Sequence, residues 1–465
     1  MKRKKLENTK ESAHSKRPTR KLSDLFEIWQ KSSDLGDLQN FSDRLSSSTE
    51  SDLKFISEQH AVAFLRHYQC TLSTQDQRIL LILQKLEHTH KSLNLAKLSP
   101  IIWGNFAALK YQNLQSLGAA LWNRPSCDEV IDNLDSKTLW NSLIHLPLEL
   151  KQSEIVDFGQ QTTVIQYDPR FVLPLLASLT VAENELTYRK FVDSNCLAFS
   201  FACLSLKEDY LRQLAYLVLW QFLGHLNSVA AGTQSFAEKS QIIYLLSLVK
   251  NSVETKSQRL ACVITHFLAR VSKLMLHPED CVYSVLNTFL LLKPVLDLEN
   301  VPELYKLFNS SSSEHFQRER HWILQLIAES LREPLDYHLL QKRHGFKLFL
   351  SFFDCPFSDQ RSRSLILRIL KSACTLASPR MDLLRNQNLL GWLGATSTSG
   401  RLTNWELGFL GDLTAQCWKS NQQNVDSTLR ASFVVCAALI RSHKLFDSVG
   451  SARYFVNDLD RILND

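Results

Sequence analysis

The chain has 465 residues, of which 45% are hydrophobic and 22% charged, as is typical of a folded, soluble protein. Glycine and proline are both scarce, at 13 and 12 residues, roughly half of average usage. Few turn-forming residues argue against strands joined by tight hairpins and favour helices. Nine of the 53 basic and two of the 47 acidic residues lie within residues 1–21, so residues 22–465 carry a net charge of −1. This near-neutral body excludes a domain that wraps nucleic acid through global positive charge.

Residues 1–51 are predicted to form a disordered basic arm followed by a serine-rich linker. Two basic clusters ten residues apart match a bipartite nuclear-import signal, which an import receptor binds as extended chain; the alternative is a solvated basic tail. The clusters comprise Lys2, Arg3, Lys4, Lys5, Lys16, Arg17, Arg20 and Lys21. A short amphipathic helix is predicted between Leu22 and Trp29. The serine and aspartate of residues 31–51 then predict a flexible linker.

Residues 52–465 are predicted to form an all-α body, because helix signals recur almost without a break. The clearest helix is 257–276, whose apolar residues form a near-complete stripe at 3.6-residue spacing. His266 and Arg270 are among the polar residues expected on its opposite face. Further helices are predicted at about 136–146, 209–227, 238–251, 280–292, 317–331, 335–343, 346–353, 360–377, 380–393, 403–418 and 427–442.

Helices of about 15 residues joined by short polar loops are typical of an irregular α-solenoid of HEAT or armadillo-like stacked helices. No repeat motif aligns within the chain, so the array is expected to be irregular. The predicted helices 209–227 and 427–442 are apolar around most of their circumference. We therefore expect both to be covered on two sides, in the inner layer of the array.

No catalytic, metal-binding or cofactor-binding motif is present. The ten cysteines form no Cys-x-x-Cys pair, and most lie in apolar helical sequence, which indicates reduced core residues in the cytosol or nucleus. Cys196 and Cys203 share a helical face, where core packing is favoured over a metal site. Phosphate-binding glycine loops and nucleophile elbows are also missing. No apolar stretch is long enough for a membrane span. We therefore predict a protein that is not an enzyme and needs no cofactor or metal.

One predicted helix carries a candidate phosphate-contacting patch. In helix 360–377, Arg361, Arg368 and Lys371 fall together on the face opposite the apolar residues, and Lys342 and Arg343 lie upstream. Basic side chains grouped in this way contact nucleic-acid phosphates in many proteins. The alternative is an ordinary solvated helix face.

Several stretches of helix and loop sequence are distinctive: residues 71–80, 100–104, 167–171, 189–195, 301–305 and 345–353, together with Trp322 and its helix. These stretches resemble the C-terminal region of the nucleolar pre-ribosomal-associated protein 1 family. They occur in order between about residues 60 and 395, some 70% of the chain. The resemblance rests on helix sequences and loop phrases.

The resemblance implies a non-catalytic nucleolar scaffold of helical repeats in early assembly of the large (60S) ribosomal subunit and in pre-rRNA processing. Its implied partners are pre-ribosomal proteins and RNA helicases. The near-neutral body predicts only weak contact with pre-rRNA, and the short apolar stretches predict no contact with membranes. Family members are far longer, so this chain is expected to be a fragment, a truncated gene product or a reduced member. The alternative functions are a helical-repeat transport receptor or adaptor protein, and an enzyme with an unfamiliar helical site.

Overall fold

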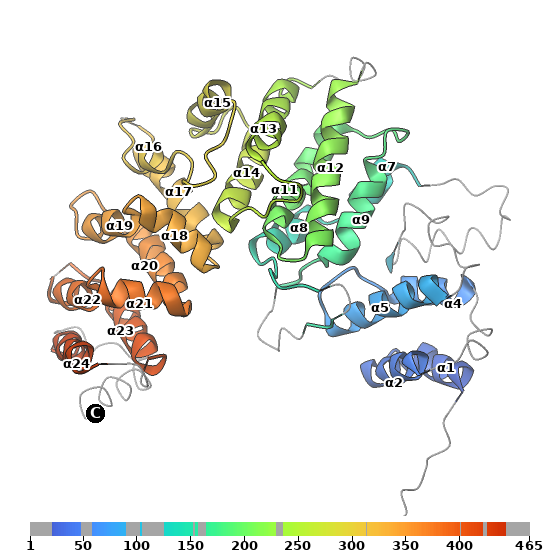
Figure 1. Cartoon of the computed structure of the whole chain (residues 1–465), viewed down its shortest axis with the longest axis horizontal. Helices are drawn as coiled ribbons and strands as arrows, with labels where there is room; N and C mark the ends of the chain where they lie inside the picture. Colours follow the sequence, from blue (N-terminus) through green and yellow to red (C-terminus); the bar gives the residue numbers. More distant parts are fainter. Residues whose placement is uncertain are drawn as a thin grey trace, which may run out of the picture. The chain divides into compact units, whose positions relative to one another are not determined.

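The computed structural model describes residues 21–47, 58–89, 103–104, 125–151, 154–156, 164–228, 236–312, 314–399, 401–421 and 426–442. Within these ranges the regular structure is helical and no strand is formed, which confirms the all-α prediction (Figure 1). The chain divides into two compact units. The first comprises Met1–Pro125 and Ser153–Thr163, and the second Ser126–Gln152 and Val164–Asp465. This division does not fall at the predicted boundary near residue 51.

The first unit has an aromatic core. Its described helices are α1 (Leu22–Ser32), α2 (Leu35–Ser46), α4 (Glu58–His67) and α5 (Thr74–Thr89). Trp29 of α1 is fully buried and stacks on Phe64 of α4, with 4.5 Å between ring centroids. Phe26 and Phe41 lie within 6 Å of the same Phe64 ring. The short helix expected near Leu22 is therefore confirmed as part of a packed core.

The prediction of a flexible linker over residues 31–51 is wrong for residues 35–46, which form α2. The carboxylate of Asp34 accepts a hydrogen bond from the Gly36 backbone N–H at 2.9 Å and caps the helix. Leu38, Phe41 and Leu45 recur at helical spacing and are at most 2% exposed. The serine content suggested a linker, but this buried apolar stripe determines the local structure.

The second unit contains most of the helices. Many lie within two residues of the predicted bounds, and α12 matches its prediction at both ends. Its helices are α7 (Cys127–Asp132), α8 (Ser136–Ile144), α9 (Pro169–Leu179), α10 (Tyr188–Asp193), α11 (Cys196–Ala202), α12 (Asp209–Asn227), α13 (Lys239–Ser252), α14 (Cys262–Leu274), α15 (Tyr283–Leu292), α16 (Leu304–Phe308), α17 (Phe316–Ser330), α18 (Pro334–Lys342), α19 (Gly345–Phe353), α20 (Gln360–Thr375), α21 (Ala377–Arg385), α22 (Leu389–Thr398), α23 (Asn404–Lys419) and α24 (Ser427–Arg441).

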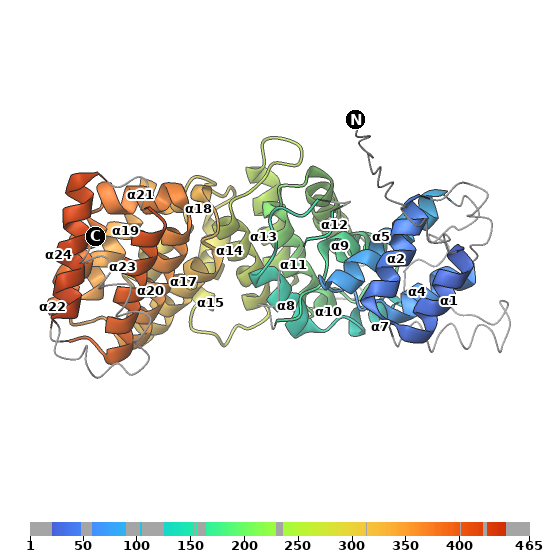
Figure 2. The same ribbon diagram turned by 90° about the horizontal axis from the view of Figure 1, so that it is seen from below.

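Every third helix of this unit belongs to a central ladder. The ladder consists of α8, α11, α14, α17, α20 and α23, and each of these helices contacts the next one in that order. In Figures 1 and 2 they follow one another from teal to red along the second unit. The remaining helices pack around them, for example α9 on α12, α13 on α15, and α22 on α24. The ladder therefore places helices far apart in sequence along one continuous row.

The inner layer differs from the one expected. Every residue of α11 is buried, and α14 is buried at all but two of its 13 positions. In contrast, Trp220 of α12 is 59% exposed and Val435 of α24 is 59% exposed. The prediction that 209–227 and 427–442 are covered on both sides is therefore wrong. His266 of α14, expected to face outward, is only 1% exposed, and burial lowers the pKa of its imidazole.

The single helix predicted at 380–393 is in fact two helices, α21 and α22. The break falls at Asn388, whose φ of 51° lies in the left-handed region. Asparagine tolerates this conformation better than most residues, which allows the chain to turn before Leu389 begins α22. Leu384 and Leu389 on either side of the break are both buried. A continuous helix would place these two apolar side chains on different faces, so the turn lets both reach the core.

A buried carboxylate fastens α18 to the ladder. Asp336 is fully buried, and its carboxylate accepts hydrogen bonds from the backbone N–H groups of Val263 (3.2 Å), Arg332 (3.2 Å) and Glu333 (3.0 Å). Burial raises the pKa of Asp336 to about 6. Arg332 also donates a hydrogen bond to the Leu146 carbonyl at 2.6 Å. Three segments distant in sequence are thus joined at one point.

Candidate functional site

The exposed face of the central ladder combines basic and aromatic side chains. At one end, Arg270 and Lys273 of α14 lie over the ring of Trp140 in α8, 5.8 and 5.3 Å from its centroid. Arg270 also forms an ion pair with Glu329 of the neighbouring helix α17. Cation–π contacts of this kind hold the basic side chains in place beside an accessible ring.

Polar contacts continue this face from α17 to α20. Asp359 caps the N-terminus of α20 and accepts a hydrogen bond from the His321 imidazole of α17 at 2.8 Å. The pKa of the Asp359 carboxyl lies below its usual value of 3.8. Partial burial acts to raise this pKa, but the hydrogen bonds from Ser362 and His321 lower it by more. Arg361 donates a hydrogen bond to the Gln325 side chain at 3.4 Å. Asp359 therefore stays ionised at neutral pH and fixes the start of α20 against α17.

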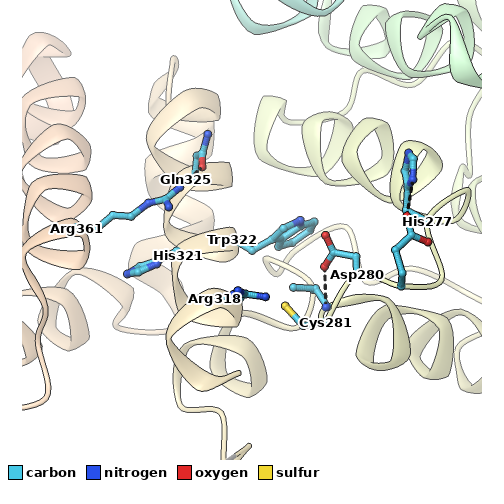
Figure 3. A pocket seen from close by; sticks show the side chains of 10 residues that line it. His277, Asp280, Cys281, Arg318, His321, Trp322, Gln325 and Arg361 are labelled. Atoms are coloured by element: carbon cyan, nitrogen blue, oxygen red, sulfur yellow. Dashed lines mark hydrogen bonds and ion pairs between the residues drawn. The ribbon is translucent and has the colours of Figure 1, made fainter. Parts of the chain in front are cut away.

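An open groove of about 600 Å³ lies beside these contacts, between α17, α20 and the loop that follows α14. Figure 3 shows Arg318 and Trp322 projecting from α17 toward the loop that carries Asp280 and Cys281. One wall of the groove is basic, through Arg318 and Arg361, while Glu279 and Asp280 make the loop wall acidic. Because the two walls carry opposite charges, the groove does not concentrate anions.

The most accessible aromatic side chains of this face lie at α23. Trp405 is 52% exposed, and its ring centroid lies 5.4 Å from that of Phe409. Lys371 of α20 lies over the Phe409 ring at 5.4 Å, and Arg368 is exposed on the same helix. Exposed rings beside lysine and arginine are the elements with which proteins stack nucleic-acid bases and contact phosphates.

The structure separates the predicted phosphate-contacting patch into two groups. Arg361, Arg368 and Lys371 share the exposed face of α20, as their spacing predicted. Lys342 at the end of α18 pairs with Glu299, and the adjacent Arg343 donates to the Asn300 side chain at 2.6 Å. The two groups thus lie on different helices with different neighbours. Phosphate contact by either group remains a prediction.

Sequence reasoning missed the aromatic side chains of this face. Trp140 and Phe409 meet their basic neighbours across helix contacts, which sequence spacing cannot reveal. One signal was available, because Trp405 and Phe409 are four residues apart and share a helical face. Of the predicted import signal, only Lys21 lies within the described residues, where it is exposed directly before α1. The other seven basic residues lie outside them.

The cysteines behave as core residues. Eight of the ten are buried, and Cys281 and Cys355 are half-buried. Burial raises the pKa of Cys196 to about 12 and also raises that of Cys203, which confirms the expected core packing of these two residues. Partial burial raises the pKa of Cys281 in the groove as well. A raised pKa disfavours the thiolate form that acts as a nucleophile at neutral pH. No group of three or more metal-ligating side chains occurs among the described residues.

These features define a class: an all-helical protein with a ladder of stacked helices and an aromatic and basic face along it. A sequence model described as nucleolar pre-ribosomal-associated protein 1 matches residues 197–392. The protein of that name from Homo sapiens is 32% identical over 342 residues, which cover 72% of this chain and 15% of the human protein. The Mus musculus protein is 31% identical over 344 residues, with the same coverage.

The chain belongs to the nucleolar pre-ribosomal-associated protein 1 family, as its sequence phrases indicated. It spans about 15% of the length of these relatives. Membership assigns the chain to the nucleus and the nucleolus. No solved structure matches the chain. Among the helices that the structure describes, none is long and apolar enough to cross a membrane.

Proposed function

We propose that this chain is a non-catalytic scaffold in early assembly of the large (60S) ribosomal subunit and in pre-rRNA processing. The observation that carries the proposal is the 32% identity over 342 residues to a relative whose name describes association with pre-ribosomes. The family model matches residues 197–392, which include the ladder helices α14, α17 and α20 with the basic residues Arg270, Arg361 and Lys371 of this face. This face is therefore a candidate surface for binding to pre-ribosomal particles.

The scaffold part of the proposal is supported by architecture and chemistry. We classify the central ladder as an irregular α-solenoid of the HEAT or armadillo kind, because each ladder helix contacts the one three places further along the chain. Such arrays offer long surfaces to several partners at once. The buried thiols have raised pKa values, and the groove beside α17 pairs opposite charges without a reactive nucleophile. This chemistry favours binding over catalysis, without a cofactor or metal.

Pre-rRNA contact is proposed to be weak when the chain acts alone. Residues 22–465 carry a net charge of −1, so their attraction for RNA comes from locally grouped basic side chains such as Arg361, Arg368 and Lys371. Each phosphate contact to a single strand contributes roughly 0.7 to the slope of log affinity against log salt. Three such contacts give binding that fades between low and physiological salt. Reversing these three charges should lower the salt slope by about 2.

A matched control is available on α18. Reversal of Lys342 and Arg343 is matched to an α20 variant in which Arg368 and Lys371 alone are reversed, since each variant reverses two charges, but Lys342 and Arg343 already contact Glu299 and Asn300. We expect the α18 variant to weaken binding to an rRNA oligonucleotide less than the α20 variant does. Tight, salt-resistant binding of residues 22–465 to naked rRNA would contradict the proposal, because the chain would then be an RNA-binding protein in its own right.

The proposed partners are pre-ribosomal proteins, RNA helicases of large-subunit assembly and a nuclear import receptor. The arm supplies the receptor site. Replacing Lys2, Arg3, Lys4, Lys5, Lys16, Arg17, Arg20 and Lys21 by alanine should cause cytoplasmic accumulation of a fluorescent fusion. Unchanged nuclear entry would contradict the import role of the arm.

The function itself is tested by purification from nuclear extract followed by RNA sequencing. The proposal expects enrichment of large-subunit precursor RNA together with assembly factors. Recovery of small-subunit precursors alone, or of no pre-ribosomal RNA, would contradict it. The same purification with a chain lacking the basic arm separates loss of import from loss of binding.

A further inference from the structure

Helices α12 and α13 lie side by side and leave an apolar groove of about 220 Å³ between them. Leu219, Trp220 and Leu223 of α12 form one wall, and Leu246 and Val249 of α13 form much of the other. The lining is completed by Tyr216, Lys250 and Val253. Neither the basic face of the ladder nor the family resemblance assigns this groove a role.

Large apolar side chains are exposed on α12 at this groove. Trp220, which lines the groove, is 59% exposed, and Leu217, three residues earlier on the same helix, is 41% exposed. A tryptophan exposed at an apolar groove marks a candidate interaction site.

The groove is already ordered without a partner. Tyr216 donates a hydrogen bond from its hydroxyl group to the Gln258 carbonyl at 2.7 Å, which fixes its ring against the groove. Lys250 lies over the Trp220 ring, 5.0 Å from its centroid, and restricts that side chain. Gly224 is exposed at one end, where an added Cβ would have no neighbour within 4 Å. A partner backbone can approach closely at that point.

Charge narrows the choice of partner. Lys250 is the one charged residue that lines the groove, and it forms no ion pair with another described residue. No carboxylate lines the groove, so an acidic side chain meets attraction there without repulsion. A basic partner would be repelled by Lys250 and would find no carboxylate in the lining.

We propose that the α12–α13 groove binds an amphipathic helix of a partner protein that carries an acidic residue on its flank. Two adjacent helices leave a furrow into which a third helix places apolar residues at i, i+3 or i+4, and i+7. The 14 residues of α13 correspond to about 21 Å, which matches a partner helix of roughly four turns. Trp220 is the anchor, because exposed tryptophans in apolar pockets contribute much of the binding free energy at interfaces. This site acts independently of RNA contacts on the ladder.

The test uses the full chain and a fluorescent 16-residue helical peptide with leucines at positions i, i+4 and i+7 and glutamates on the flank. A second peptide carries lysines in place of the glutamates. Trp220→Ser should weaken binding of the acidic peptide by about tenfold or more. Trp405→Ser, which removes a tryptophan of similar exposure on α23, is the matched control and should leave the affinity unchanged. Lys250→Glu should weaken binding of the acidic peptide and strengthen that of the basic one.

The affinities are measured by fluorescence anisotropy titrations of the wild type, Trp220→Ser, Trp405→Ser and Lys250→Glu with both peptides. An exchange of peptide preference in Lys250→Glu, with loss of binding in Trp220→Ser, supports the proposal. Equal loss in Trp220→Ser and Trp405→Ser overturns it, as does an affinity that Lys250→Glu leaves unchanged for both peptides. Concentration-dependent self-association that Trp220→Ser abolishes overturns it as well, because the groove would then bind a second copy of this chain.

Discussion

Helices α14 and α12 are both rich in apolar residues, but the structure uses them in different ways. In α14 the apolar residues face partners on several sides, with α11 and α17 before and after it in the ladder. In α12, Val218 and Phe222 are fully buried, whereas Leu217 and Trp220 remain exposed. The difference shows that an apolar circumference does not by itself identify an inner helix. An apolar face that no described helix covers is a surface available to a partner.

The largest expected effect comes from cutting a large side chain out of the ladder. Phe267→Ala in α14 should lower the free energy of unfolding by about 3–5 kcal/mol, because the ring is fully buried and meets Phe289 edge-on at 5.7 Å. Trp220→Ala in α12 should change the same quantity by less than about 0.5 kcal/mol, since most of that side chain is exposed. Urea denaturation of both variants measures the contrast, and similar losses would remove the distinction between the two helices.

A smaller effect, with a defined pH dependence, is expected at Asp336. Burial raises the pKa of this carboxyl from 3.8 to about 6, so the folded state retains its proton over a pH range in which the unfolded state has lost it. Its stabilising contribution is complete below about pH 4 and is lost as the pH rises through 6.

Asp336→Asn removes this titration. From pH 4 to pH 7 the free energy of unfolding of the wild type should fall relative to the variant, by on the order of 2–3 kcal/mol. Thermal unfolding of both proteins across this range provides the measurement. A difference that moves the opposite way would show that the carboxylate is stabilised in its charged form.

The smallest effect concerns α2 in the first unit, an intermediate case in which a serine-rich sequence carries a short buried stripe. Asp34→Ala removes the N-cap acceptor of the Gly36 N–H and should cost about 1 kcal/mol. Asp34→Asn retains a capping oxygen and should cost less. Equal stability of all three proteins would show that the apolar stripe alone holds α2.

The sequence predicted where each helix begins and ends better than it predicted which helices pack against one another. The ends of α12 and the outward orientation of Arg361, Arg368 and Lys371 followed from helical periodicity, which depends only on nearby residues. The burial of His266 and the exposure of Trp220 depend on which helices meet, and hydrophobic content does not encode that. Helix α2 was missed because its apolar stripe consists of only three residues, Leu38, Phe41 and Leu45, in a stretch rich in serine. Their spacing was nevertheless helical. The aromatic neighbours of the basic residues lie on other helices, so sequence spacing could not predict these contacts.

Sedimentation of nuclear extract that contains the tagged chain tests the central claim most directly: the chain resides on large-subunit precursors mainly through protein contacts. The account predicts that wild-type protein sediments with these precursors at physiological salt. It also predicts that most of the variant with Arg361, Arg368 and Lys371 reversed still does so. Sedimentation of the wild type apart from large-subunit precursors, or complete release of the reversed variant, would contradict it.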